Sequence, residues 1–168
     1  MARFPQTARV GVLVLGLSLL GSSLGIAQEF LDANQKETLR GLETVNLIVN
    51  VGFAREGPSK QLLWSDVAGR LREIPLQVGS GNAETSERLP AFVVDVVVLK
   101  RMMRTFSFLI TVRIYQHVGL LRDEGRKIPA ITWKKWIMGE GGFSSIREKT
   151  AELVDHFTDE YRSVNPVE

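Results

Sequence analysis

The alternation of apolar and polar residues predicts where this chain forms strands. In the segment RTFSFLITVRIYQH, residues 104–117, one face is entirely apolar, with Phe106, Phe108, Ile110, Val112 and Ile114. A period of two is typical of a strand with one buried face. Because strands usually have about five or six residues, we expect this segment to bend at a bulge or to project past its sheet.

Two other segments have strong strand character. Residues 43–51 have apolar residues at every odd position from 45 onward, and residues 91–100 are apolar on both faces apart from Asp95. The second pattern is typical of a strand in the middle of a sheet. Since only residues 101–103 separate it from segment 104–117, the two should form a long antiparallel hairpin.

Shorter strands and loops fill the rest of the predicted sheet. Strands are predicted at 74–78 and 130–138, where the chain is apolar but brief. The segments 79–90 and 122–129 are rich in Gly, Pro and charged or small polar residues, which is typical of loops and turns.

Two amphipathic helices are predicted by apolar residues at helical spacing. The first covers 60–73, with Ser59 as its N-cap. The second starts at Ser145, which together with Glu148 has the spacing of a capping box, and it ends at Asn165.

The order β-α-β-β-β-β-α predicts an α/β protein of the α+β type. We expect a two-layer sandwich, with a mainly antiparallel sheet of four or five strands and two helices on one face. The predicted organisation is an export segment at 1–27, a linker or short helix at 28–42, a single domain at 43–164 and a tail at 165–168. The sheet face away from the helices is then free to meet a partner.

The N-terminal residues have the pattern of an export signal. Arg3 and Arg9 precede an apolar run at 10–20, and small residues lead to Ala27. This order predicts a secretory signal peptide cut before Gln28 and a periplasmic or secreted protein. The alternative is a retained membrane anchor through residues 10–27 with the domain on the exported side, because an uncharged stretch of about 18 residues is close to the spanning limit.

The amino-acid composition excludes several kinds of site and partner. The chain has no cysteine, which excludes disulfides, thiolate metal sites and cysteine nucleophiles. An exported protein without disulfides is more typical of a bacterial envelope than of a eukaryotic secreted module. Removal of residues 1–27 would take two basic residues from the 21 and leave 19 basic and 19 acidic residues, so we predict no nucleic-acid binding.

Charge is nevertheless unevenly distributed, because residues 100–135 carry nine basic and two acidic side chains. One interpretation is pairing within the molecule, with a basic sheet edge facing an acidic helix. The other is a patch for anionic lipid headgroups or an acidic partner. The candidate patch consists of Lys100, Arg101, Arg104, Arg126, Lys127, Lys134 and Lys135.

Catalytic motifs are missing from the sequence. The two histidines, His117 and His156, are about 40 residues apart with no further ligand motif. After the predicted export segment 1–27, neither GxSxG nor a complete GxGxxG occurs. The glycine-rich segment 139–145 could bind an anion at a helix start, although ordinary capping explains it equally well. We predict a protein that is not an enzyme and has no cofactor or metal, with catalysis by Asp95 or His117 as a minor alternative.

Three further side chains have two interpretations each. Asp95, in an apolar strand, is either a general acid or base with a raised pKa or the ion-pair partner of a neighbour such as Arg113. Trp133 and Trp136 suggest a membrane-interface patch with the lysines between them. On a strand, however, residues three apart point to opposite faces, so one of the two should be core.

The leading hypothesis is a non-enzymatic binding or accessory module that uses its open sheet face. The expected partner is a protein or a second copy of the chain. The alternative is a membrane-anchored accessory subunit of a membrane protein complex with an uncleaved N-terminal helix. The predicted partner face consists of Asn46, Ile48, Asn50, Val93, Asp95, Val97, Leu109 and Arg113.

Overall fold

The computed structural model describes residues 34–52, 59–80, 90–100 and 105–166. The chain divides into two compact units, Met1–Gln35 and Lys36–Glu168, and the predicted export segment lies outside the described residues. After a helical turn at 34–37, the order confirms the prediction. The elements are β1 (Thr44–Gly52), α2 (Lys60–Leu71), β2 (Gln77–Ser80), β3 (Ala91–Lys100), β4 (Phe106–Leu120), β5 (Asp123–Gly141) and α3 (Phe143–Val164).

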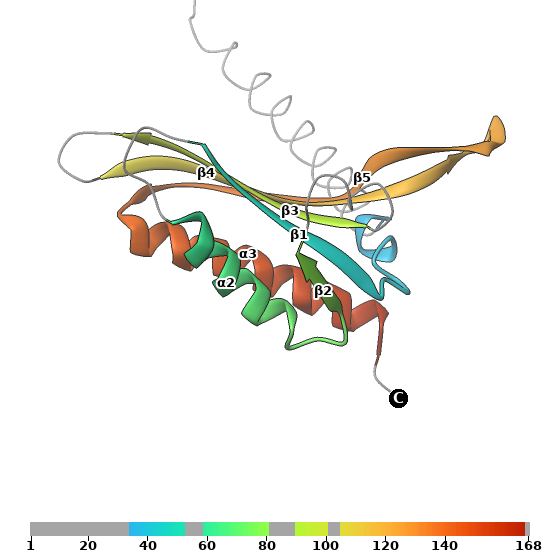
Figure 1. Cartoon of the computed structure of the whole chain (residues 1–168), viewed down its shortest axis with the longest axis horizontal. Coiled ribbons are helices and arrows are strands. Elements are labelled where there is room, and N and C mark those ends of the chain that lie inside the picture. The colour runs from blue at the N-terminus through green and yellow to red at the C-terminus, as the bar shows by residue number, and fades with distance from the viewer. Residues whose placement is uncertain (1–33, 53–58, 81–89, 101–104, 167–168) are drawn as a thin grey trace, which may run out of the picture. The chain divides into compact units, whose positions relative to one another are not determined.

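The five strands form one open sheet in the order β2-β1-β3-β4-β5. β1 pairs in parallel with β2 and β3, whereas the longer registers, β3 with β4 and β4 with β5, are antiparallel. The parallel connection from β1 to β2 passes through α2, as parallel pairing requires a crossover. Both helices lie on the same face of the sheet (Figure 1), which confirms the α+β class and the two-layer arrangement.

The core lies between this sheet face and the helices. The alternating residues predicted to face inward, from Val45 in β1 to Ile114 in β4, are buried, except for Val51, which is half-buried. The ring of Phe157 in α3 contacts Phe92 and Trp133 edge to face, with centroids 4.9 and 5.2 Å apart. The apolar faces of the strands and of α3 therefore pack together as one buried layer.

Several predicted boundaries were wrong. β2 begins at Gln77 rather than at 74 and continues through Ser80. α3 begins at Phe143 with Gly142 as its N-cap and no side-chain cap, so Ser145 and Glu148 form no capping box. By contrast, the predicted cap of α2 is confirmed, because the Ser59 hydroxyl accepts a hydrogen bond of 3.4 Å from the Leu62 amide.

Most of the segment predicted as a turn at 122–129 is part of a strand, because β5 begins at Asp123 and pairs with β4 for most of its length. The turn itself consists of Leu121 and Arg122. The register shifts between Ile114 and Tyr115, where Thr132 is the extra residue of β5. The Thr38 hydroxyl donates a 3.1 Å hydrogen bond to the Thr132 carbonyl at this bulge. The hairpin of β4 and β5 then extends beyond the other strands (Figure 1), so the long strand both bends and projects.

Tyr161 of α3 links the helix to two loops, and its loss should be measurable. Its buried hydroxyl donates to the Leu42 carbonyl at 2.8 Å and lies 3.3 Å from the Pro75 carbonyl. We expect Tyr161→Phe to lower the free energy of unfolding by about 1 kcal/mol at neutral pH. Urea unfolding of both proteins by circular dichroism measures this difference.

The same residue should make stability depend on alkaline pH. Burial, with a smaller contribution from the negative charge of Glu43, raises the pKa of Tyr161. The folded state therefore favours the neutral phenol. This contribution is complete below the ordinary tyrosine pKa of about 10 and is lost as the pH rises through the higher folded value. Tyr161→Phe should lack that part of the alkaline loss, and identical pH profiles for the two proteins would contradict the assignment.

Candidate functional site

The candidate site is the open sheet face, which is the side of the sheet opposite α2 and α3. The register places its residues in rows across the strands. Val97 of β3, Leu109 of β4 and Met138 of β5 are direct neighbours, and we call these three residues the apolar row. The next row contains Asn50, Asp95, Thr111 and Trp136, and the one after it contains Ile48, Val93, Arg113 and Lys134.

The predicted partner face is accessible only in part. Asn46 and Val93 are 3% and 7% exposed, so neither can contribute much contact area. Ile48, Leu109 and the charged pair are half-buried, whereas Asn50 and Val97 are exposed. Val97 of β3 is therefore the exposed apolar residue among those predicted for the partner face.

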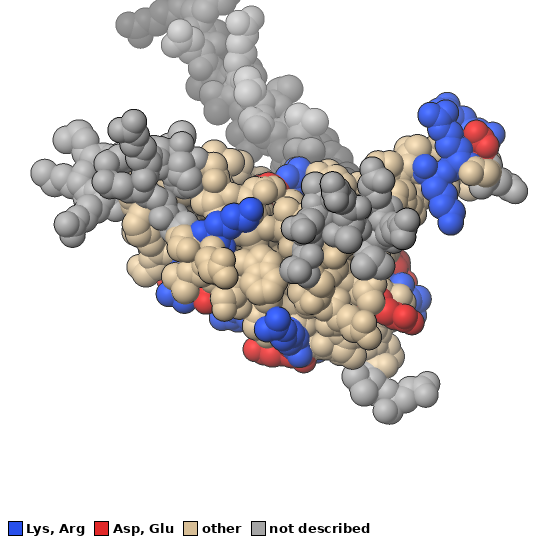
Figure 2. All heavy atoms as spheres, in the orientation of Figure 1, with Lys and Arg blue, Asp and Glu red and all other residues tan. Residues whose placement is uncertain are grey.

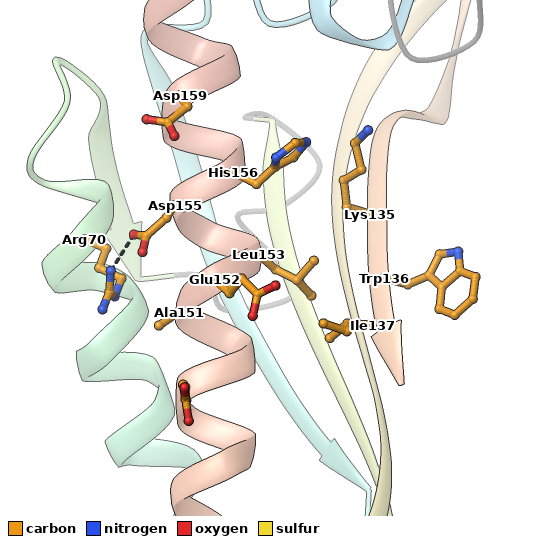
Figure 3. A pocket seen from close by; sticks show the side chains of 11 residues that line it. Arg70, Lys135, Trp136, Ile137, Ala151, Glu152, Leu153, Asp155, His156 and Asp159 are labelled. Carbon is orange, nitrogen blue, oxygen red and sulfur yellow. Dashed lines mark hydrogen bonds and ion pairs between the residues drawn. The ribbon is translucent and has the colours of Figure 1, made fainter. Parts of the chain in front are cut away.

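Met138 was missed by the prediction, and the orientation of Trp136 was left open. They are 68% and 59% exposed, and Trp136 points away from α3 (Figure 3). Trp133, in contrast, is fully buried, which confirms that one of the two tryptophans is core. The sequence could not decide which, because each face of residues 133–138 carries both a tryptophan and a lysine.

Asp95 and Arg113 form the polar centre of the open sheet face. Their side chains make an ion pair, and the Asn50 amide donates a 2.9 Å hydrogen bond to the second carboxylate oxygen. Burial lowers the pKa of Arg113, but the hydrogen bond and charge of Asp95 outweigh it, so the pKa lies above its ordinary value. The arginine also lies 5.5 Å from the centroid of the Tyr115 ring. The ion-pair interpretation of Asp95 is confirmed, and the pair links β3 to β4 on the open sheet face.

Two neighbouring lysines of the predicted basic patch lie on opposite faces of the sheet. Lys134 is exposed on the open sheet face, whereas Lys135 turns toward the helices and lies 3.6 Å from Glu160 of α3. The contact between Lys135 and Glu160 matches the predicted pairing of basic strand residues with the acidic helix.

The described members among the rest of the predicted basic patch lie at the two ends of the sheet. Arg126 and Lys127 are exposed in the projecting hairpin (Figure 2). Lys100 pairs in register with Phe106, at the opposite end of β4. Arg101 and Arg104 lie outside the described residues.

No catalytic or metal-binding arrangement emerges in the part of the chain that the structure describes. His117 is exposed in the hairpin, and His156 of α3 lies 2.9 Å from Glu160. No group of three His, Asp or Glu side chains suited to a metal ion occurs among these residues. The glycine-rich segment ends β5 and caps α3, and the Phe108 ring covers Gly139 so closely that an added Cβ would lie 2.7 Å from the ring.

A groove of about 780 Å³ runs along α3 beside β5. Its walls include Ile137 and Leu153, and acidic side chains line its helical side (Figure 3). One of these, Asp155, forms an ion pair with Arg70 of α2. The groove therefore separates the outer edge of β5 from the exposed side of the helix.

Comparison with known proteins gives distant structural likenesses. No protein-family model and no curated protein matches the sequence. A hypothetical protein from Chlamydia trachomatis is 14% identical, with 72% of this chain and 92% of that chain covered and a TM-score of 0.36. The PelC dodecamer from Paraburkholderia phytofirmans is 14% identical, with 68% and 86% covered and a TM-score of 0.41.

A minor lipoprotein from Acinetobacter baumannii is 12% identical, with 74% of this chain and 93% of that chain covered and a TM-score of 0.36. Because the TM-scores are below 0.5, we base the function on the residues of this chain.

Proposed function

We propose that this protein is a non-enzymatic binding or accessory module of the bacterial envelope that docks a protein on its open sheet face. The apolar row carries the proposal. Together with Trp136, the row forms an accessible apolar strip beside the ion pair of Asp95 and Arg113. Aromatic residues and methionine beside a polar rim are the composition typical of protein interfaces.

Export is supported by the N-terminal sequence, and the absence of cysteine favours a bacterial envelope over a eukaryotic secreted protein. The basic start, the apolar run and the small residues before Gln28 favour a cleaved signal peptide and a periplasmic or secreted domain at 43–164. A protein without disulfides depends on packing alone, and the buried layer between the sheet and the helices supplies it.

The projecting hairpin favours a second candidate, a membrane-anchored accessory subunit. Leu121 at its tip is fully exposed, and the exposed cations Arg122, Arg126 and Lys127 lie in the same hairpin together with Asp123. Figure 2 shows mainly basic side chains at the end of the hairpin, with an acidic one among them. An exposed apolar side chain among cations suits an anionic lipid surface. Within the described ranges, none of the helices has the length and apolar character to cross a bilayer.

Comparative capture tests the docking face. We expect the C-terminally tagged protein to recover a specific protein from native envelope extracts, and Val97→Glu to reduce that recovery at least roughly tenfold, because it buries a charge in the interface. The matched control is Leu62→Glu in α2, since Leu62 is 43% exposed and Val97 is 48% exposed. Equal recovery by all three proteins would contradict the proposal.

Intact mass of the recovered protein separates the two candidates. The mass of residues 28–168 in the soluble fraction is expected for the periplasmic module. The full-length mass in the membrane fraction would instead support the anchored subunit.

A further inference from the structure

The outer edge of β5 is the longest free edge of the sheet. β5 ends the strand order, and among the described residues no strand pairs with its outer side. The opposite edge, β2, has only four residues. Proteins usually cover, shorten or interrupt such edges, because their backbone groups otherwise pair with another chain. Pro129 and the bulge at Thr132 interrupt one part of β5, so the regular edge comprises residues 133–141.

The side chains of this edge are complementary to themselves. If two copies of β5 pair antiparallel about Ile137, Lys134 of each copy lies opposite Glu140 of the other. In the same register, Trp136 of each copy lies opposite Met138 of the other. All four side chains are exposed, and Glu140 also accepts a 3.2 Å hydrogen bond from Ser107 within its own chain. Opposite charges and apolar residues that face each other directly both favour strand pairing.

The same register continues the apolar row across the molecular boundary. Val97, Leu109 and Met138 of one copy would be followed by Trp136 of the second copy. Because the arrangement is two-fold, the row of the second copy would continue in the same way onto the first. The two most exposed apolar side chains of β5 would then lie at the centre of a joint surface rather than at its margin.

The helix layer leaves the edge accessible. The groove of about 780 Å³ lies along β5 and α3, so α3 does not close over the outer side of the strand. Ile137 lines this groove, and Ile137 of the second copy would lie beside it. An isologous contact of this kind is the commonest form of symmetric assembly.

We propose that a second copy of this chain docks on the outer edge of β5, by antiparallel pairing centred on Ile137. The inference rests on the proposed function and names a second copy as the partner that extends the open sheet face at the edge of β5. The two sheets would join into one, with both helix layers on the same side.

Charge exchange tests the register. In the exported protein purified through a C-terminal tag, we expect sedimentation equilibrium to show a dimer. Lys134→Glu should raise the dissociation constant of that dimer roughly tenfold or more, because it creates two like-charge pairs. Glu140→Lys should act in the same way, and the double variant should restore association. Lys60→Glu, at the exposed start of α2, is the control with the same charge change.

A monomer at all concentrations, or a double variant as weak as the single ones, would overturn the proposal. Restoration by the double variant also excludes misfolding as the cause of the single effects.

Cysteine cross-linking gives a second test, because the chain has no cysteine of its own. Pairs in an antiparallel ladder alternate between hydrogen-bonded and closer, non-hydrogen-bonded geometry, with Cα atoms about 5.5 and 4.5 Å apart. In the proposed register, a cysteine at position 137 faces its own copy, and a cysteine at position 136 faces one at position 138. One of these two pairings must have the closer geometry, so either Ile137→Cys alone or a mixture of Trp136→Cys with Met138→Cys places two cysteines close together. We expect rapid disulfide formation in one of these two samples. Lys134→Cys alone should not cross-link, since its two copies would lie roughly 20 Å apart.

The outcomes separate this inference from the proposed function. A monomer that still captures a protein in a Val97-dependent manner would overturn the dimer and leave the docking face intact. If the dimer cross-links but Val97→Glu does not change the recovery of envelope proteins, the edge contact is supported and the proposed docking on the open sheet face is contradicted.

Discussion

Replacing Trp133 by alanine should lower the free energy of unfolding by about 3–5 kcal/mol, the usual cost of removing a buried aromatic side chain. Trp133 is fully buried against the ring of Phe157. Its indole Nε1 donates a 2.6 Å hydrogen bond to Glu160, so the substitution also removes a partner of a half-buried carboxylate. Urea unfolding of both proteins, followed by circular dichroism, measures the loss.

Trp136 provides the matched control for this prediction. It lies three residues further along β5 but is 59% exposed, so Trp136→Ala should change the free energy of unfolding by less than about 1 kcal/mol. Both variants should be measured at low protein concentration, where self-association contributes least to stability. Equal losses for the two tryptophans would contradict the assigned orientation of β5.

Replacing Asp95 by valine should cost about 2 kcal/mol, because it leaves the Arg113 guanidinium half-buried without its counter-ion. Breaking a fully buried pair costs about 3–5 kcal/mol, and we expect less here because the two side chains are 22% and 27% exposed. The same substitution removes the acceptor of the Asn50 amide. Urea unfolding again provides the measurement.

A double substitution distinguishes an ion pair from two independent contributions. Asp95→Val with Arg113→Leu removes both charges from neighbouring strands, and it should be more stable than Asp95→Val alone. If the losses in free energy of unfolding of the two single variants simply add in the double variant, the charges do not interact, and no ion pair stabilises the open sheet face.

The local patterns of the sequence determined most elements of the fold. Alternation in segments 43–51 and 104–117 predicted β1 and β4, because a strand with one buried face must alternate. The helical stripe and Ser59 predicted α2 to within two residues of its observed end at Leu71. The same alternation required that Trp133 and Trp136 lie on opposite faces. These features depend only on the geometry of a single strand or helix.

The exposed part of the open sheet face could not be predicted from local patterns, because it depends on contacts between different strands. Residues 122–129 resemble a turn by composition, but Asp123 and residues 127–129 pair with β4, since a long neighbouring strand offers hydrogen bonds to any extended segment. Val97, Leu109 and Met138 are far apart in the sequence and become neighbours only through the register of three strands. The edge position of β5 likewise follows from the strand order. The sequence by itself therefore determined which residues alternate, whereas the tertiary structure decided which faces and edges remain exposed, because exposure depends on what packs against each strand.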